Sequence, residues 1–329
     1  IHIYALLKDG KAILKKIQQL GSVHLNNLKE DDFFIKESTI EDLVNIEREM
    51  ALVDESLEIL RSYAPENTSF LNFLNGRQEI TIDEYENWEE KHKEFKRISE
   101  RIVSLNRRIS ENTAEIQRLQ VQIDALIPWS KLDIPLQFHG TRLSAVFIGT
   151  LPGEVSLEQF LIELSKLIPQ VEAIHAEIIN KSKEQTCIFV VCHRNDAAVV
   201  DNALRANGFS RPPVSSSNLS PAEQKSELEH RIKALNQQIQ NSKAEIAGYA
   251  DQRDSLKFLY DWLAMKHERL EKAAYLLESK RVLIISGYIP EREVNKLASE
   301  LNKSFIVHIE IHDPAPEEDV PVLLENNKF

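Results

Sequence analysis

Two long stretches of the chain repeat apolar side chains in steps of three and four, the spacing of a coiled-coil seam. The first begins after Thr81 and is stopped by Pro128. Its apolar seam residues are Trp88, Phe95, Ile98, Ile102, Leu105, Ile109, Ile116, Leu119, Ile123 and Leu126. The second begins at Ser220-Pro221, an N-cap followed by a proline at the first helical position. Its apolar seam runs from Leu228 to Leu277, and Gly248 falls off this seam.

A seam this narrow buries one stripe, so each helix needs a partner. The segment between the stretches, residues 129–219, has the pattern of a compact α/β domain and not that of a long return linker. We therefore predict that the two helices pair antiparallel as one hairpin. The intervening segment then lies at the tip, and the chain termini meet at the opposite end.

A shorter heptad helix precedes the hairpin. It starts at Ser38-Thr39-Ile40-Glu41, a pattern that predicts a capping box, and it ends near Ala64-Pro65. Its seam residues are Leu43, Ile46, Met50, Val53, Leu57 and Leu60. A second capping box is predicted at Thr81-Ile82-Asp83-Glu84, where the first arm of the hairpin begins.

Strand and helix patterns alternate at both termini and at the tip. The opening predicts strand, helix and strand, with Gly21 as the helix C-cap. Residues 282–287, 291–301 and 305–311 predict a second strand, helix and strand. We expect these two units to complete one sheet. At the tip, the predicted elements are strand 143–149, helix 157–167, strands 171–179 and 186–192, and helix 196–207.

These elements predict an α+β fold in which two small α/β lobes of split βαβ type are joined by a long antiparallel coiled-coil hairpin. The expected parts are a proximal lobe (1–37 and 281–329), an accessory helix and loop (38–80), the coiled coil (81–127 and 220–280) and a distal lobe (128–219). A weak internal repeat relates Ala145 to Pro152 with Leu283 to Pro290, so the two lobes are expected to share a unit.

Composition narrows the function classes. A net charge of −12 argues against nonspecific binding to nucleic acid or to anionic lipid. The chain has 9 glycines and lacks both Gly-x-x-x-x-Gly-Lys and Gly-x-Gly-x-x-Gly, so it offers no recognisable nucleotide cradle. Cys187 and Cys192, five apart on a predicted strand, point to opposite faces and cannot pair with each other, which favours a reducing compartment.

Few residues suggest catalytic or metal chemistry. His308, Glu310 and His312 share one face of a predicted strand, which permits a metal site, but the preferred interpretation is a solvated face with Val307, Ile309 and Ile311 packed inward. His175, Glu177 and His193 on the tip strands are expected to be exposed or satisfied histidines and a surface carboxylate. Glu89-Glu90 and Asp31-Asp32 are expected to be surface charges. We therefore predict no catalytic, cofactor-binding or metal residues, and no enzyme.

Polar residues interrupt the seams at Asn112, Ser242, Arg253 and His267. A polar seam residue can fix the register of a coiled coil at some cost in stability, and the alternative is ordinary tolerance in a long one. In either case these positions are the expected points of local flexure.

The closing residues carry a family resemblance. Gly287-Tyr288-Ile289-Pro290-Glu291, Asp313-Pro314, the acidic 317–319 and Pro321 to Phe329 resemble the junction before the membrane domain in subunit I of the V-type ATPase of archaea and bacteria, the homologue of the eukaryotic subunit a. Gly21-Ser22-Val23-His24-Leu25 resembles the opening of that family. Tyr288 stands where Trp is more usual, and Asn327 where many members have Pro.

The resemblance implies a non-catalytic stator subunit that lies on the cytoplasmic side of a membrane. Its implied partners are the peripheral-stalk heterodimer, at both lobes, and a C-terminal membrane domain and rotor ring beyond Phe329. Because the chain begins without Met and ends abruptly, we expect it to be a soluble piece of a longer protein. The resemblance assigns no residue here to ion translocation and no cofactor.

The alternative hypothesis is a soluble coiled-coil scaffold or tether unrelated to ion transport. Membrane helices with an embedded arginine beyond Phe329 would favour the stator. The sequence leaves open the stalk-contact residues, the coupled ion, the direction of ATP turnover and the curvature of the coiled coil.

Overall fold

The computed structural model describes the chain except residues 37, 67–80, 213–216, 316, 319 and 323–329. It has mixed helix and antiparallel sheet and divides into two compact units. The first unit comprises Ile1–Leu105 with Glu245–Phe329, and the second comprises Asn106–Ala244. The boundary falls inside α3 (Ile82–Leu126) and inside α6 (Pro221–Gly248), so both helices belong in part to each unit.

Strands from both ends of the chain pair in one antiparallel sheet of the first unit, in the order β2-β7-β1-β8 with β6 also on β7. In β1, Ile3 lies opposite Ile285 on one side and Ile309 on the other. The strands are β1 (His2–Leu6), β2 (His24–Leu25), β6 (Leu277–Glu278), β7 (Val282–Tyr288) and β8 (Val307–Glu310). Helices α1 (Gly10–Leu20) and α8 (Glu291–Ser304) contribute much of its core, including Ile13, Leu14, Ile17, Leu297 and Leu301.

Helix α1 ends at the glycine that the sequence predicted as its C-cap. Gly21 has φ +63°, a left-handed conformation in which glycine avoids the strain that a Cβ would bring. Its N–H donates to the carbonyl of Ile17 at 3.0 Å. The predicted C-cap is therefore confirmed, and it turns the chain directly into β2.

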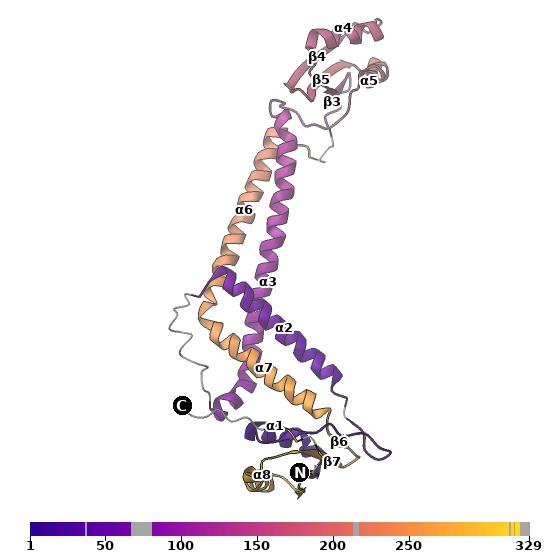
Figure 1. Ribbon diagram of the computed structural model, residues 1–329. Coiled ribbons are helices and arrows are strands. Elements are labelled where there is room, and N and C mark those ends of the chain that lie inside the picture. Colours follow the sequence, from indigo (N-terminus) through magenta and orange to yellow (C-terminus); the bar gives the residue numbers. More distant parts are fainter. Residues whose placement is uncertain (37, 67–80, 213–216, 316, 319, 323–329) are drawn as a thin grey trace. The chain divides into compact units, whose positions relative to one another are not determined.

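Three helices of the first unit pack on one another: α2 (Ile40–Tyr63), the first part of α3 and α7 (Arg253–Ala273) (Figure 1). The ring centroids of Trp88 on α3 and Phe258 on α7 lie 4.4 Å apart. Lys96 of α3 forms a salt bridge with Glu49 of α2 at 2.6 Å. Buried apolar residues from all three include Val53, Leu60, Ile102, Leu105, Leu256, Leu259 and Leu263. The heptad helix predicted as an accessory element is thus one member of this bundle.

The apolar seam predicted one continuous helix to Leu277 for the second arm, and this prediction is wrong. Helix α6 ends at Gly248, the short 3₁₀ helix Ala250–Gln252 follows, and α7 then runs only to Ala273. Glycine in a helix costs about 1 kcal/mol relative to alanine, and Arg253 donates to the carbonyls of Leu60 and Ala64 at the end of α2. The packing of α7 on α2 therefore stabilises the break after Gly248 more than a continuous heptad helix would stabilise the second arm.

Helix caps were predicted with mixed success. The box at Ser38 to Glu41 is wrong, because Thr39 is the N-cap of α2 and makes no side-chain capping hydrogen bond. At the start of α6, by contrast, the Ser220 N–H donates to Glu223 Oε2 at 2.9 Å, and the Glu223 N–H reaches Ser220 Oγ at 3.4 Å. The side chains of the box predicted at Thr81 to Glu84 lie largely outside the described residues.

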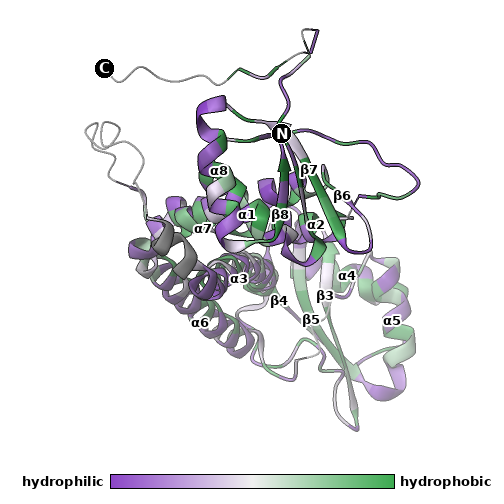
Figure 2. Ribbon diagram, turned by 90° about the horizontal axis from the view of Figure 1, so that it is seen from below, coloured by the Kyte–Doolittle hydropathy of each residue, from purple (hydrophilic) through white to green (hydrophobic). Residues whose placement is uncertain are grey.

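In the second unit, the remaining parts of α3 and α6 pair antiparallel, as predicted. Asn112 Nδ2 donates to Gln238 Oε1 at 3.2 Å, and Glu115, further along α3, pairs with the earlier residue Arg231 of α6 at 2.8 Å. Leu119, Ile123 and Ile239 are buried seam residues. Figure 2 shows that α6 is otherwise mainly hydrophilic, so a single stripe accounts for its burial.

The second unit also holds a three-stranded antiparallel sheet in the order β3-β5-β4, so β4 is an edge strand. Its elements are β3 (Ser144–Pro152), α4 (Leu157–Leu167), β4 (Ile174–Lys181), β5 (Gln185–His193) and α5 (Ala197–Ala206), close to the predicted bounds. Both helices pack on one face, through Phe160, Leu164, Val200 and Leu204. Trp129 and Leu132 cover the other face, which explains why β3 and β5 are apolar almost throughout (Figure 2).

Cys187 and Cys192 are buried free thiols on opposite faces of this sheet, as predicted. Cys187 belongs to the Trp129 side, and Cys192 to the side of α4 and α5. Burial raises the pKa of both thiols. Short 3₁₀ helices complete the description: Leu7–Asp9, Ile127–Trp129, Arg194–Asp196 and Ala250–Gln252.

The two sheets have the same order of pairing. Strand β3 is flanked by β5 and by a bridge from Thr150 to Ser210, just as β7 is flanked by β1 and β2. Glycine occupies equivalent places, because a Cβ on Gly149 would lie 2.4 Å from the carbonyl oxygen of Ser210, and one on Gly287 would lie 2.4 Å from that of His24. The two halves of the sequence repeat thus form β3 and β7, and in each strand a glycine allows the backbone of a neighbouring short segment to come close.

Candidate docking surfaces

The histidine-rich strand forms a solvent-facing cluster around one carboxylate. Glu310 lies 3.5 Å from His308 and 3.7 Å from His312, whose side chains are 71% and 64% exposed, and it accepts a hydrogen bond from the Tyr4 hydroxyl at 3.3 Å. Desolvation and the Glu310 charge raise the pKa of Tyr4. Among the described residues, no group of three or more His, Cys, Asp or Glu side chains is arranged to hold a metal ion. Ile311, expected to pack inward, is 57% exposed.

The other singled-out histidines and carboxylates have local partners. His175 lies 3.4 Å from Glu177 on the exposed side of β4. The ring of His193 accepts from the N–H of Asn195 at 3.3 Å and so caps the short helix that follows β5. Asp31 accepts from the N–H groups of Phe33 and Phe34 in a turn, and Asp32, Glu89 and Glu90 are exposed. These contacts are structural or superficial, and none assembles a nucleophile with a base.

The polar seam residues divide between the two units. Asn112 pairs with Gln238, and Ser242 is buried, within the antiparallel α3–α6 pair. His267 of α7 lies 3.3 Å from Glu47 of α2. Arg253 caps the end of α2 and also pairs with Glu66 at 3.3 Å. Arg253 and His267 therefore contribute to the packing of α7 on α2. The seam pattern did not predict α2 as a partner of this arm.

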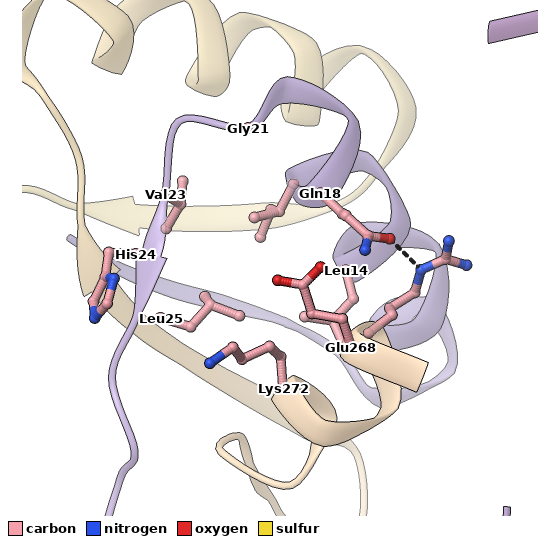
Figure 3. A pocket seen from close by; sticks show the side chains of 10 residues that line it. Leu14, Gln18, Gly21, Val23, His24, Leu25, Glu268 and Lys272 are labelled. Atoms are coloured by element: carbon pink, nitrogen blue, oxygen red, sulfur yellow. Dashed lines mark hydrogen bonds between the residues drawn. The ribbon is translucent and has the colours of Figure 1, made fainter. Parts of the chain in front are cut away.

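A cavity of about 380 Å³ opens between α1, β2 and α7 in the first unit (Figure 3). Val23, His24 and Leu25, part of the motif that resembles the V-type family, form one wall, and Glu268 and Lys272 of α7 form another. Gln18 links α1 to α7, since its Nε2 donates to the Met265 carbonyl and its Oε1 accepts from Arg269 Nε, at 2.9 and 2.8 Å. The motif thus lines a surface recess together with the charged side chains of Glu268, Arg269 and Lys272.

A second recess, of about 370 Å³, lies between α4 and β4 in the second unit. We call it the α4 groove. Its lining residues are Leu161, Ile162, Leu164, Ser165, Ile168, Val171, Glu172 and Ile174. The sequence analysis did not predict this groove. The pattern that could have indicated it is that α4 has more apolar positions than one core-facing stripe requires.

None of the helices in the described ranges has the length and apolar character needed to cross a membrane. The two recesses are the candidate surfaces for binding other molecules.

Comparisons with known proteins find curated relatives that share one name. No family model matches the sequence. The chain is similar to A-type ATP synthase subunit I of Methanothermobacter thermautotrophicus, with 23% identity over 202 residues, and of Pyrococcus horikoshii, with 24% over 207 residues. The subunit of Saccharolobus solfataricus matches with 25% identity over 239 residues. These matches cover 60%, 61% and 69% of this chain and 30%, 31% and 32% of the relatives.

The solved structures that match include a crystal structure of the cytoplasmic N-terminal domain of subunit I, homolog of subunit a, of V-ATPase. It is 16% identical, with a TM-score of 0.44, and the match covers 93% of this chain and 99% of that one. The curated relatives confirm the resemblance to subunit I that residues 21–25 and 287–329 suggested. The prediction of a non-catalytic subunit, and not an enzyme, agrees with their names.

Proposed function

We propose that this chain is the peripheral part of a subunit I of an A-type or V-type rotary ATPase and acts as its stator arm. The similarity to four archaeal subunits I carries the proposal. In this role the chain lies on the cytoplasmic side of a membrane and binds the peripheral-stalk heterodimer. A membrane domain following in the longer protein supplies the ion path and faces the rotor ring.

The mechanical part of the proposal assigns each segment a task. Residues 1–37 with 281–329 form the proximal docking lobe, residues 128–219 form the distal one, and the antiparallel pair of α3 and α6 joins them. Torque on a rotor does useful work only when the catalytic head is held still. Helices that continue through both units, as α3 and α6 do, suit a load-bearing connection because their backbone hydrogen bonds are internal.

Binding to the stalk tests the proposal. The purified chain, residues 1–329, is mixed with the peripheral-stalk heterodimer of the same ATPase at low ionic strength, where surface charges are least screened, and complex formation is followed by light scattering after size exclusion. We expect a stable complex, and none with an unrelated acidic coiled-coil protein of similar length. Absence of any complex would contradict the stator role.

A second test separates a stator from a tether unrelated to ion transport. Removing this part from the assembled ATPase is expected to leave ATP hydrolysis by the catalytic head while ion pumping into vesicles is lost, because the head then turns with the rotor. Unchanged pumping would favour the tether.

A further inference from the structure

Helix α4 carries more apolar surface than its own core uses. Phe160 and Leu164 are buried against the sheet, 2% and 1% exposed. Leu161 and Ile162, on the adjoining side of the same helix, are 36% and 54% exposed. Large apolar side chains that adjoin in this way are typical of an interaction site, whereas scattered ones are not.

The exposed side chains continue into a recess. Beyond the end of α4, the partly buried Val171 and, at the start of β4, the partly buried Ile174 line the recess, together with Ile168, which is only 4% exposed. From Leu161 to Ile168, α4 advances about 10 Å, or two turns. That length accepts two apolar anchors placed one turn apart on an incoming helix.

The edge strand beside the groove disfavours an added strand as occupant. Its pairing with β5 shifts register between Ile178 and Asn180, and a bulge of this kind twists an edge away from further pairing. Exposed charges also lie along β4: Glu177, beside His175, and Lys181, which pairs with Glu154 at 2.9 Å. Such an edge leaves the side-chain groove as the surface that a partner can use.

The groove has acidic groups on its own face. Glu172 is a lining residue, and Glu158 precedes Leu161 and Ile162 by three and four positions, which places it on their side of α4. Both glutamates are exposed. The one basic residue of α4, Lys166, follows Ile162 by one turn on the outer rim. Basic side chains on the partner would complement Glu158 and Glu172.

We propose that the α4 groove holds an amphipathic helix of the peripheral stalk, whose apolar stripe is flanked by basic residues. This inference rests on the proposed stator function and names the surface and the chemistry of that contact. The apolar stripe packs on Leu161, Ile162 and Val171, and the flanking cations meet Glu158 and Glu172.

The test uses the full chain and the purified peripheral-stalk heterodimer, with affinity measured by biolayer interferometry. Ile162→Lys puts a charge into the groove and is expected to weaken binding by about tenfold or more. Leu167→Lys is the matched control, since Leu167 is 51% exposed on the same helix but does not line the groove. It should leave the affinity within about twofold. Glu172→Lys should also weaken binding, with a smaller salt dependence than the wild type.

Circular dichroism and thermal melting establish that each variant is folded. Equal affinity of Ile162→Lys, Leu167→Lys and wild type would overturn the assignment of the groove while leaving the stator function in place. If the wild-type chain does not bind the stalk, the function and the groove assignment both fall. If the chain alone dimerises and Ile162→Lys makes it monomeric, the occupant is a second copy and the proposal is wrong.

Discussion

The hydroxyl groups of Ser56 on α2 and Ser99 on α3 lie 3.1 Å apart, and both residues are completely buried. Small side chains at this crossing let the two helices approach closely. The heptad pattern placed Leu57 and Ile98 on the seams, whereas the structure leaves these neighbours only half-buried. Because α7 also packs on α2 and α3, the most deeply buried positions of these helices are not all the predicted seam residues.

Replacing Ser99 with leucine should destabilise the chain, because extra methyl groups cannot enter a closely packed helix crossing without displacing it. We expect the free energy of unfolding to fall by about 1–3 kcal/mol. Urea denaturation followed by circular dichroism measures it. Ser104→Leu on the exposed side of α3 is the control and should stay within about 0.5 kcal/mol. Equal losses in both variants would contradict the close crossing.

Arg253 should contribute more to stability than an ordinary surface arginine. Its side chain is 12% exposed and donates to the backbone carbonyl of Ala64, the C-cap of α2, and to that of Leu60, which also accepts from the Ala64 N–H. We expect Arg253→Ala to lower the free energy of unfolding by about 1.5–3 kcal/mol, as for hydrogen bonds to a charged group.

The comparison for Arg253 is Arg107→Ala. Arg107 pairs with Glu111 one turn away, but its side chain is 81% exposed, so the loss should be below about 0.5 kcal/mol. The same urea titration measures both variants. If the two midpoints move together, Arg253 does not cap α2.

Two glycines should respond oppositely to alanine. A Cβ on Gly149 would lie 2.3 Å from the Phe209 ring and 2.4 Å from a backbone oxygen, whereas one on Gly248 meets nothing within 4 Å. Gly149→Ala should cost about 1–3 kcal/mol through overpacking. Gly248→Ala, at the end of α6, should be neutral or stabilise by up to about 1 kcal/mol through helix propensity. Thermal melting compares them, and a lower midpoint for Gly248→Ala would show that the break after α6 requires glycine.

Glu300 should stay ionised in acid. Hydrogen bonds from Lys303 and from Lys16, the latter on α1, lower its pKa from 4.5 to about 2. Because the folded-state pKa is depressed, this contribution to stability is present above about pH 4.5 and is lost as the pH falls toward 2. Lys16→Met should raise the pKa of Glu300, as measured by carboxyl NMR titration. Lys296→Met, which removes the partner of Glu293 on the same helix, should not.

The sequence by itself determined the elements whose signals are local. The bounds of α4, the turn at Gly21, the opposite orientation of the two cysteines and the antiparallel pairing of α3 with α6 all follow from periodicity, glycine conformation or strand alternation. The tail motif that resembles subunit I was likewise visible, because it depends on residue identity alone.

Only the tertiary structure decided what depends on contacts between distant segments. The membership of α2 in a bundle, the break after Gly248 and the buried serines at 56 and 99 arise because α2 competes for the apolar faces of α3 and α7, and a heptad pattern does not state how many partners a helix has. The α4 groove has the same origin. Whether Leu161 and Ile162 belong to the core or to the surface is set by where β4 and the segment after α4 lie, which no local pattern specifies.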